Sequence, residues 1–347
     1  MYIKYFKCVK KVRFIPNFLF LLLIFFGCSK NKPEIISFSG FTMGTTYSIK
    51  ISEQNPINSI HQLQSEIDSV LLHVNKLFST YMSDSEISQF NKSDSIFIIS
   101  DEFGELFLQS KQINNISKGA FDPTVHPLVK LWGFGNKGRI NELPPNDIIQ
   151  STLNKIGFDN ILIKNDLLVK LYPYIELDFS AIAKGYGVDK VSELLILKNI
   201  NNFMVEIGGE VYCNGKNNKN DWSIGLQNPF LEIGNENILK VINLNNKAMA
   251  TSGNYRNYFE IDGQKYSHTI NPKTGYPVTH NVVSVSVVAN DCSSADAYAT
   301  ALMVMDKEVG IEMINSINGL EAVIIYGDNE DFKLLKSEGI DEIISDF

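Results

Sequence analysis

An aspartate and a threonine stand four residues apart in the segment SADAYATAL, where Asp296 is followed by Thr300. Residues at this spacing share one face of an α-helix, and residues 294–305 have the pattern of a helix. Carboxylate and hydroxyl oxygens are the ligands that a hard cation such as Mg²⁺ prefers. In the alternative interpretation Asp296 complements the helix N-terminus and Thr300 bonds back to a carbonyl. Spacing alone favours this structural alternative.

A histidine lies in the turn-rich segment YSHTINPKTGYPV, where His268 is one of five histidines in the chain. A loop imidazole near a carboxylate or a metal can act as a general base at neutral pH. A lone loop histidine is more often structural or solvated, and its position in the sequence does not decide between these roles.

The segment LDFSAIAKGYGVDKV places Asp178 at the end of a predicted strand, and Lys184, Gly185 and Gly187 at the start of a predicted helix. Backbone N–H groups at a helix N-terminus can receive a phosphate. The segment has neither a Walker nor a Rossmann pattern, and its glycines could equally serve close packing. The Gly-Gly pair at 208–209 is similarly open between a turn and a loop that faces a ligand.

The elements that must position these residues follow from periodicity. Apolar residues at helical spacing predict a helix over 59–78 with Ser59 as its cap, and a second helix is predicted over 101–117. Predicted strands cover 41–52, 161–163, 167–171, 203–207, 211–214, 222–227, 239–244 and 282–289. Strands joined by hairpins, with helices in separate blocks, indicate an α+β fold of mainly antiparallel sheets, either one compact domain or two lobes.

Composition limits the classes of function. Of the 347 residues, 44% are hydrophobic and 20% are charged, as in ordinary globular proteins. Four cysteines provide neither a disulfide framework nor a zinc site. Whether Cys213 and Cys292 pair is open.

The first 27 residues have the features of an export signal. A basic start precedes an apolar run over 18–26 that is too short to span a bilayer as a helix, and Gly27-Cys28 follows. This junction resembles the lipobox of bacterial lipoproteins, which implies a signal peptide over 1–27, a lipidated tether over 28–36 and a folded domain over 37–347. Loss of the signal peptide would remove five positive charges and no negative ones, changing the net charge from −8 to −13. That charge disfavours nucleic-acid binding.

Seven segments, in order, resemble the ApbE family of FAD:protein FMN transferases. They are MGTTYSI from Met43, STYMSDSEISQFN from Ser79, GAFDPTVHPLVKLWGFG from Gly119, LDFSAIAKGYGVDK from Leu177, VEIGGEV from Val205, ATSGNYRNYFEIDGQKYSHTINPKTGYPV from Ala250 and SSADAYATALMV from Ser293. The resemblance covers nearly all of the chain beyond the signal peptide. It implies an ApbE-like (T-fold-like) single domain.

The resemblance also implies a site and a reaction. Contacts with FAD would come from Met43, Tyr81, Ala120, Phe121, Asp122, Asp178, Lys184 and Ile270. Mg²⁺ would lie on Asp296, Thr300 and the carbonyl of Ala181, and His268 would be the catalytic residue. FMN would pass from FAD to a threonine of a membrane-associated redox subunit, with release of AMP, at the periplasmic face of a bacterial membrane. The alternatives are hydrolysis of FAD to FMN and AMP, and a lipoprotein that only binds flavin.

Some positions depart from the family pattern. Phe179-Ser180 replaces two glycines, His126 replaces a small residue and Glu206 replaces an aspartate. Ala299 stands where some members have a further acidic ligand, so more of the cation's coordination would come from FAD phosphates and water.

Overall fold

The computed structural model describes residues 34–53, 59–135, 138, 140, 142–231, 237–254, 258–261, 263–329 and 331–346. Cys28 and the expected signal peptide lie outside these ranges. Residues 34–36, which were expected in the tether, instead begin the first strand, β1. Among the described residues, no helix combines the length and the apolar character needed to cross a membrane.

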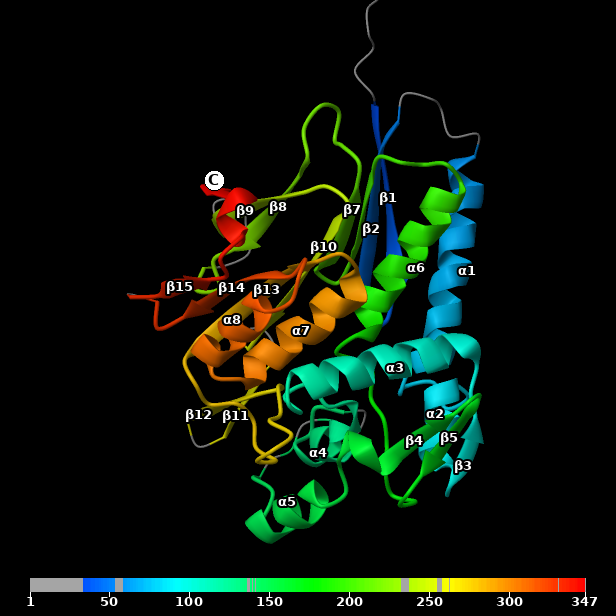
Figure 1. Cartoon of the computed structure of the whole chain (residues 1–347), viewed down its shortest axis with the longest axis vertical. Coiled ribbons are helices and arrows are strands. Elements are labelled where there is room, and N and C mark those ends of the chain that lie inside the picture. The colour runs from blue at the N-terminus through cyan, green and yellow to red at the C-terminus, as the bar shows by residue number, and fades with distance from the viewer. Residues whose placement is uncertain are drawn as a thin grey trace, which may run out of the picture. The chain divides into compact units, whose positions relative to one another are not determined.

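An eight-stranded sheet forms the centre of the molecule (Figure 1). Its strands lie in the order β1-β2-β6-β7-β10-β13-β14-β15, and each described pair is antiparallel. Their bounds are β1 Glu34–Thr42, β2 Thr45–Glu53, β6 Phe203–Ile207, β7 Glu210–Asn214, β10 Lys247–Gly253, β13 Val282–Ala289, β14 Glu321–Tyr326 and β15 Lys333–Lys336.

The other described strands form three smaller sheets. The first has the order β16-β9-β8, the second β3-β5-β4, and the third is the hairpin β11-β12. Their bounds are β3 Ile96–Ile98, β4 Ile161–Lys164, β5 Leu167–Lys170, β8 Trp222–Gln227, β9 Ile238–Leu244, β11 Tyr258–Ile261, β12 Gln264–Ser267 and β16 Ile344–Asp346.

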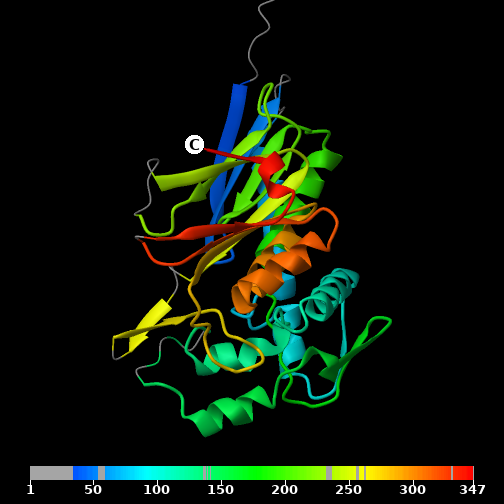
Figure 2. The ribbon, with the colours of Figure 1, turned by 60° about the vertical axis from the view of Figure 1, so that its left-hand side comes forward.

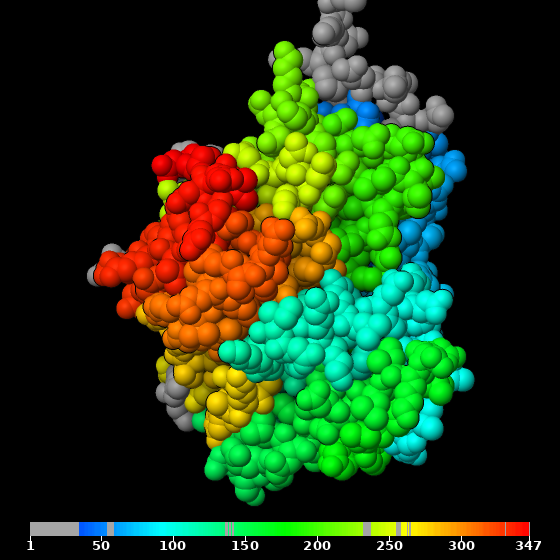
Figure 3. All heavy atoms as spheres, in the orientation of Figure 1, coloured from blue at the N-terminus to red at the C-terminus, as the bar shows by residue number. Residues whose placement is uncertain are grey.

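The helices gather on one side of the main sheet and at its lower end, as the two ribbon views show (Figures 1 and 2). They are α1 Ile60–Phe78, α2 Glu86–Lys92, α3 Asp101–Ile116, α4 His126–Leu131, α5 Asn146–Leu153, α6 Ala183–Leu197, α7 Cys292–Val304 and α8 Lys307–Asn315. The surfaces of α3, α6 and α7 meet on one face of the molecule (Figure 3).

Around β13 the main sheet is buried on both faces, and this explains the continuous apolar run of that strand. Successive side chains of a strand point to opposite faces. Val287 therefore packs in the core under the helices, whereas Val288 packs in a second core beneath β8 and β9. A third apolar cluster joins Leu128, Trp132 and Ile149 to Phe259 and Ile270.

The α+β fold expected from the sequence is confirmed, and most long elements lie where periodicity predicted them. Ser59 caps α1 by accepting a hydrogen bond from the N–H of Gln62. The strand predicted over 41–52 is wrong in one respect, because Met43 and Gly44 have φ angles of 49° and 72° and form a turn between β1 and β2. Cys213 and Cys292 are both buried free thiols.

Candidate active site

The side chains of Asp296, Lys184 and Glu210 form a buried charged cluster where α7, α6 and β7 meet. The Lys184 Nζ lies 3.1 Å from Glu210 Oε1 and 3.5 Å from Asp296 Oδ1. The second oxygen of Asp296, Oδ2, accepts a hydrogen bond of 3.1 Å from the N–H of Gly185. Both carboxylate residues are only 3% exposed. The cluster thus joins two residues expected from the sequence with one that was not.

Close contact between the starts of α6 and α7 produces this arrangement. A Cβ atom on Gly185 would lie 2.2 Å from the carbonyl oxygen of Cys292, so only glycine fits at this position. On the next turn of α6, the Asp189 carboxylate accepts the N–H groups of Cys292 and Ser293 at 2.7 and 2.9 Å. These N–H groups lie at the free N-terminus of α7, which needs such partners.

The position of Asp296 argues against one of its two sequence interpretations. Asp291, not Asp296, caps α7, because its side chain accepts the N–H of Ser294. Asp296 instead lies in the second turn and reaches the first turn of α6. Thr300, one turn further on, is half-buried with its Oγ1 3.3 Å from the Ser252 Oγ of β10. The aspartate is therefore free of the capping role that spacing had favoured.

Burial controls the protonation of the cluster. Together with the charge of Asp296, it raises the pKa of Glu210 to about 7, against the opposing effect of the Lys184 ammonium. Burial would lower the pKa of Lys184, but attraction by Asp296 and Glu210 outweighs burial and raises it. The Oε2 of Glu210 is buried and has no hydrogen-bond partner in the described structure.

The cluster suits a cation through its chemistry and its charge. One ammonium faces two carboxylates, so one negative charge remains uncompensated whenever Glu210 is ionised. Thr300 adds a hydroxyl, and Ala181 lies half-buried two residues before α6 begins. Within the ranges that the structure describes, no group of three or more His, Cys, Asp or Glu side chains could hold a metal. A cation here would therefore also need hydroxyl, backbone and ligand oxygens.

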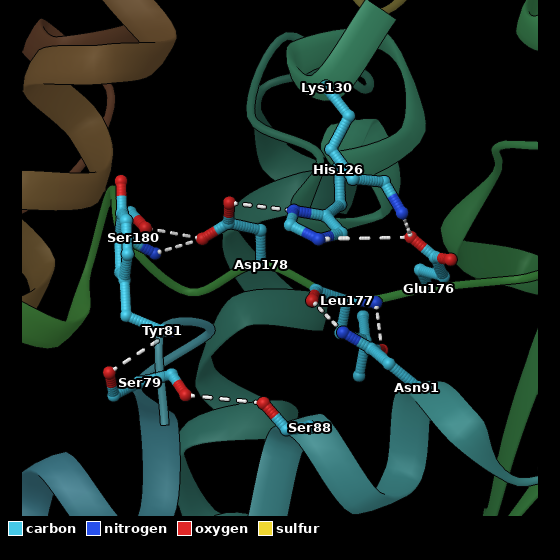
Figure 4. A network of polar contacts seen from close by, with 10 residues as sticks. All are labelled: Ser79, Tyr81, Ser88, Asn91, His126, Lys130, Glu176, Leu177, Asp178 and Ser180. Atoms are coloured by element: carbon cyan, nitrogen blue, oxygen red, sulfur yellow. Dashed lines mark hydrogen bonds and ion pairs between the residues drawn. The ribbon is translucent and has the colours of Figure 1, made fainter. Parts of the chain in front are cut away.

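A second polar network surrounds Asp178, which the sequence predicted, and His126, which it did not (Figure 4). Asp178 Oδ2 lies 3.0 Å from His126 Nδ1, while Oδ1 accepts the N–H of Ser180 at 2.8 Å and also its hydroxyl. Glu176 lies 3.8 Å from His126 Nε2 and pairs with Lys130. Burial acts to raise the pKa of Asp178, but His126 and Ser180 outweigh it and lower that pKa. The carboxylate is thereby held ionised.

The residues expected at 120–122 lie beside this network. The N–H of Asp178 donates to the carbonyl of Pro123 at 2.8 Å. Asp122 accepts both the N–H and the hydroxyl of Thr124, and burial raises its pKa to about 6 despite these bonds. Ala120 and Phe121 are buried, and their side chains belong to the main core. The backbone N–H groups of both residues donate to Ser117, and the carbonyl of Phe121 accepts from the Asn114 side chain.

His268 and Ile270 follow β12 and pack against the segment that follows α4. The His268 ring lies edge-on to the ring of Phe134, with 6.3 Å between centroids. Ile270 is buried in the third apolar cluster, where the indole N–H of Trp132 donates to the carbonyl of Gly275 at 2.7 Å. The sequence blocks 119–135 and 251–277 therefore meet in space.

Met43 and Tyr81 stand at the edges of the predicted site. Met43 forms part of the turn after β1, and its side chain packs against Gly187 of α6. A Cβ atom added to Gly187 would lie only 2.8 Å from the Met43 Cε. The side chain of Tyr81 is 72% exposed, and its backbone N–H donates to the Ser79 Oγ (Figure 4). Exposure leaves the Tyr81 ring available to a ligand.

Comparison with known proteins places the chain among flavin transferases. The model of the ApbE family matches residues 43–324. The FAD:protein FMN transferase of Vibrio cholerae is 39% identical over 327 residues, which cover 93% of this chain and 97% of that protein. The Haemophilus influenzae protein of the same name is 38% identical over 312 residues, 87% of this chain and 90% of its own length.

Solved structures agree with the sequence comparison. The flavin transferase ApbE from Vibrio cholerae superposes with a TM-score of 0.82 at 38% identity, covering 90% of this chain and 99% of that one. The apo form of the Pseudomonas stutzeri flavinyl transferase ApbE gives a TM-score of 0.81 at 33% identity, over 90% and 97% of the two chains. The resemblance found in the seven sequence segments is confirmed: this chain belongs to the ApbE family.

Proposed function

We propose that the chain transfers the FMN half of FAD to a threonine hydroxyl of another protein and releases AMP, with Mg²⁺ as the cation. The coarser assignment, a FAD:protein FMN transferase, follows from membership of the family at high coverage. The observation that carries the proposed chemistry is the buried, negatively charged cluster of Asp296, Glu210 and Lys184, one helical turn from the Thr300 hydroxyl.

Asp296, Thr300 and the carbonyl of Ala181 would hold the cation. A divalent cation bound there supplies neutralisation of the FAD pyrophosphate and orients it for in-line attack. Support comes from the oxygen donors and from the negative charge that Lys184 leaves uncompensated. Because Ala299 provides no further carboxylate, the remaining ligands would be phosphate oxygens and water.

His268 would accept the proton of the threonine hydroxyl, which is a weak nucleophile at neutral pH. The threonine oxygen forms a bond to the FMN phosphorus while the bond from that phosphorus to the AMP oxygen breaks. The hydroxyl proton passes to the imidazole, and AMP leaves with the electron pair. Flavin binding would involve Met43, Tyr81, Ala120, Phe121, Asp122, Asp178, Lys184 and Ile270.

We further propose that the protein acts outside the cytoplasm, attached to a bacterial membrane by lipid on Cys28. This location rests on the basic and apolar N-terminal residues before Gly27-Cys28. The acceptors would be threonine-bearing redox subunits of the same membrane, so that enzyme and acceptor share one surface.

One assay separates the proposal from its alternatives. Purified protein is incubated with FAD, Mg²⁺ and a threonine-bearing acceptor, after which acceptor mass and free AMP are measured. The proposal expects one FMN adduct for each AMP released. AMP without an adduct would identify a hydrolase, and retained FAD without AMP would identify a protein that only binds flavin. A threonine-to-valine acceptor is the matched control, because it keeps the shape but lacks the hydroxyl.

A further inference from the structure

The ammonium of Lys184 lies between two carboxylates that come from different elements. It is 3.1 Å from Glu210 Oε1, on the first residue of β7, and 3.5 Å from Asp296 Oδ1, on α7. The side chains of Glu210 and Asp296 are each 4% exposed, whereas that of Lys184 is 29% exposed. The lysine therefore has access to solvent that the carboxylates lack.

The two carboxylates are held in place by the backbone around them. Asp296 accepts the N–H of Gly185, whose own position is fixed by contact with Cys292. Glu210 follows the turn at Gly208 and Gly209, whose φ angles of 61° and 107° favour glycine. Lys184, in contrast, carries its charge on a flexible four-carbon stem. If one member of the cluster moves, it is the lysine.

The charges of the cluster do not balance. When Glu210 is ionised, one ammonium compensates only one of the two carboxylates, and the Oε2 of Glu210 has no hydrogen-bond partner in the described structure. A divalent cation on Asp296 would change the net charge of this cluster from −1 to +1, and it would repel the ammonium that already lies 3.5 Å from the same carboxylate. The cation and the ammonium cannot both stay close to Asp296.

We propose that Lys184 competes with the divalent cation for Asp296, and that Glu210 receives the ammonium when the cation binds. Glu210 is then a positioning residue, which acts through Lys184. Its unpartnered Oε2 provides the second acceptor that the ammonium needs after it leaves Asp296. In the absence of the cation, the Lys184 ammonium reduces the free-energy cost of burying the carboxylates of Glu210 and Asp296 near one another. The inference rests on the cation site of the proposed function.

Mn²⁺ binding in the absence of FAD tests the competition without reference to activity. Mn²⁺ prefers the same oxygen ligands as Mg²⁺, and its free form can be counted by electron paramagnetic resonance. K184M removes the competitor, so the Kd for Mn²⁺ should fall by about tenfold. E210Q leaves the ammonium with Asp296 alone, so the Kd should rise by about tenfold. K190M is the matched control, because Lys190 lies on the same helix but pairs with exposed Glu193.

The double variant K184M/E210Q separates a role through Lys184 from a direct role of Glu210. If Glu210 acts through the lysine, E210Q should weaken Mn²⁺ binding at least about threefold more in the wild-type background than in the K184M background. Equal weakening in the two backgrounds would overturn the positioning role. Weaker binding by K184M than by wild type would overturn the competition.

Folding of the variants is checked by thermal unfolding, because K184M leaves Glu210 buried without its partner. If K184M does not fold, the double variant is compared with E210Q, and it should bind Mn²⁺ at least about thirtyfold more tightly. The D296N variant distinguishes the inference from the function on which it rests. If D296N binds Mn²⁺ with wild-type affinity, the proposed cation site is wrong and the inference fails with it. If D296N loses Mn²⁺ binding but K184M binds Mn²⁺ as the wild type does, only the inference is wrong.

Discussion

Asp296 is the side chain on which the proposed cation site depends most. Asp296→Asn keeps an oxygen that can accept the N–H of Gly185, so the contact between α6 and α7 should persist. The variant loses the negative charge, and transfer should fall about 10²–10³-fold because the phosphates are poorly neutralised. FAD affinity should fall less, since flavin and ribose contacts remain. Steady-state transfer and flavin fluorescence titration measure the two effects. Full activity in excess chelator would argue against any role for a metal.

His268 is expected to act on the proton rather than on flavin binding. His268→Asn keeps one hydrogen-bonding group but cannot usefully take up a proton, so the transfer rate should fall about 10²–10⁴-fold while FAD affinity stays within about twofold. Wild-type transfer should also decline as pH falls and the imidazole becomes charged, and the variant should lack this decline. The exposed His61 gives a control in His61→Asn. Near wild-type transfer by His268→Asn at saturating FAD and acceptor would place the base elsewhere.

Spacing relates residues only within one element, the family resemblance names residues on different elements such as Lys184 and His268, and neither identified Glu210. Asp296 and Thr300 are linked by helical spacing, which is visible in the sequence. Glu210 is 26 positions from Lys184, and their contact depends on β7 lying next to α6. His126 was noted only as a departure from the family pattern, although it contacts Asp178. For Glu210 and His126, the one available signal was a buried charged or titratable side chain with no partner close to it in the sequence.

Between elements, the contact of α6 with α7 determines the geometry of the charged cluster. Gly185→Ala should place a Cβ 2.2 Å from the Cys292 carbonyl oxygen. Because this oxygen belongs to the backbone, relieving the clash requires the two helices to move apart. We expect a loss of at least about 2 kcal/mol in the free energy of unfolding, together with weaker cation binding. Gly104→Ala in α3 is the matched control. Its nearest neighbour would be the Ile99 Cδ1 at 3.4 Å, and alanine should stabilise the helix by up to about 1 kcal/mol. Denaturant unfolding of the two variants compares them directly; equal stabilities would contradict the close contact.

Asp189 links the same two helices and should make stability depend on pH. Burial raises its pKa to about 7, despite the N–H groups of Cys292 and Ser293 and with a contribution from Asp291, against a usual value near 3.8. Between these values the folded state binds a proton that the unfolded state has lost. Stability should therefore decrease as pH rises from about 4 to 7, by at most about 1.4 kcal/mol per pH unit from this group.

Asp189→Asn removes this titration, so the slope of unfolding free energy against pH should become shallower over that window. Urea unfolding at several pH values measures the slope. The variant should also be less stable at pH 5, because an amide can accept only one of the two α7 N–H groups with its oxygen. An unchanged slope would assign the pH dependence to other buried carboxyls, such as Glu210 and Asp122.

Long periodic elements were predictable, whereas short ones and the order of strands were not. Helix α1 and strands β6, β8 and β13 have a clear pattern of apolar spacing. The turn at Met43 was missed, because a methionine with a positive φ angle is uncommon and gives no turn signal. Helices α4 and α5 span only six and eight residues, too few to establish a period. The eight-strand order depends on contacts far apart in the chain, which local spacing does not encode.

Taken as a whole, the molecule packs α6 and α7, which carry Lys184 and Asp296, against each other and against the main sheet. Separately, the segment after α4 packs against the residues that follow β12, where the rings of Phe134 and His268 meet. The strand β1 begins at the upper end of the sheet in Figure 1.

The lipid anchor is the remaining prediction at this scale, and it concerns residues outside the described ranges. Because Gly27-Cys28 ends an apolar run, the mature protein should begin at a diacylated Cys28 and fractionate with membranes. Cys28→Ser removes the thiol that carries the lipid and should give an unprocessed or soluble exported form, with FMN transfer in vitro unchanged. Cys8→Ser is the matched control, since Cys8 lies within the expected signal peptide. Mass spectrometry of membrane and soluble fractions measures the N-terminus directly. Residues 1–27 found intact on the wild-type protein would rule out lipobox processing, and the apolar run would then have to hold the protein at the membrane without a lipid.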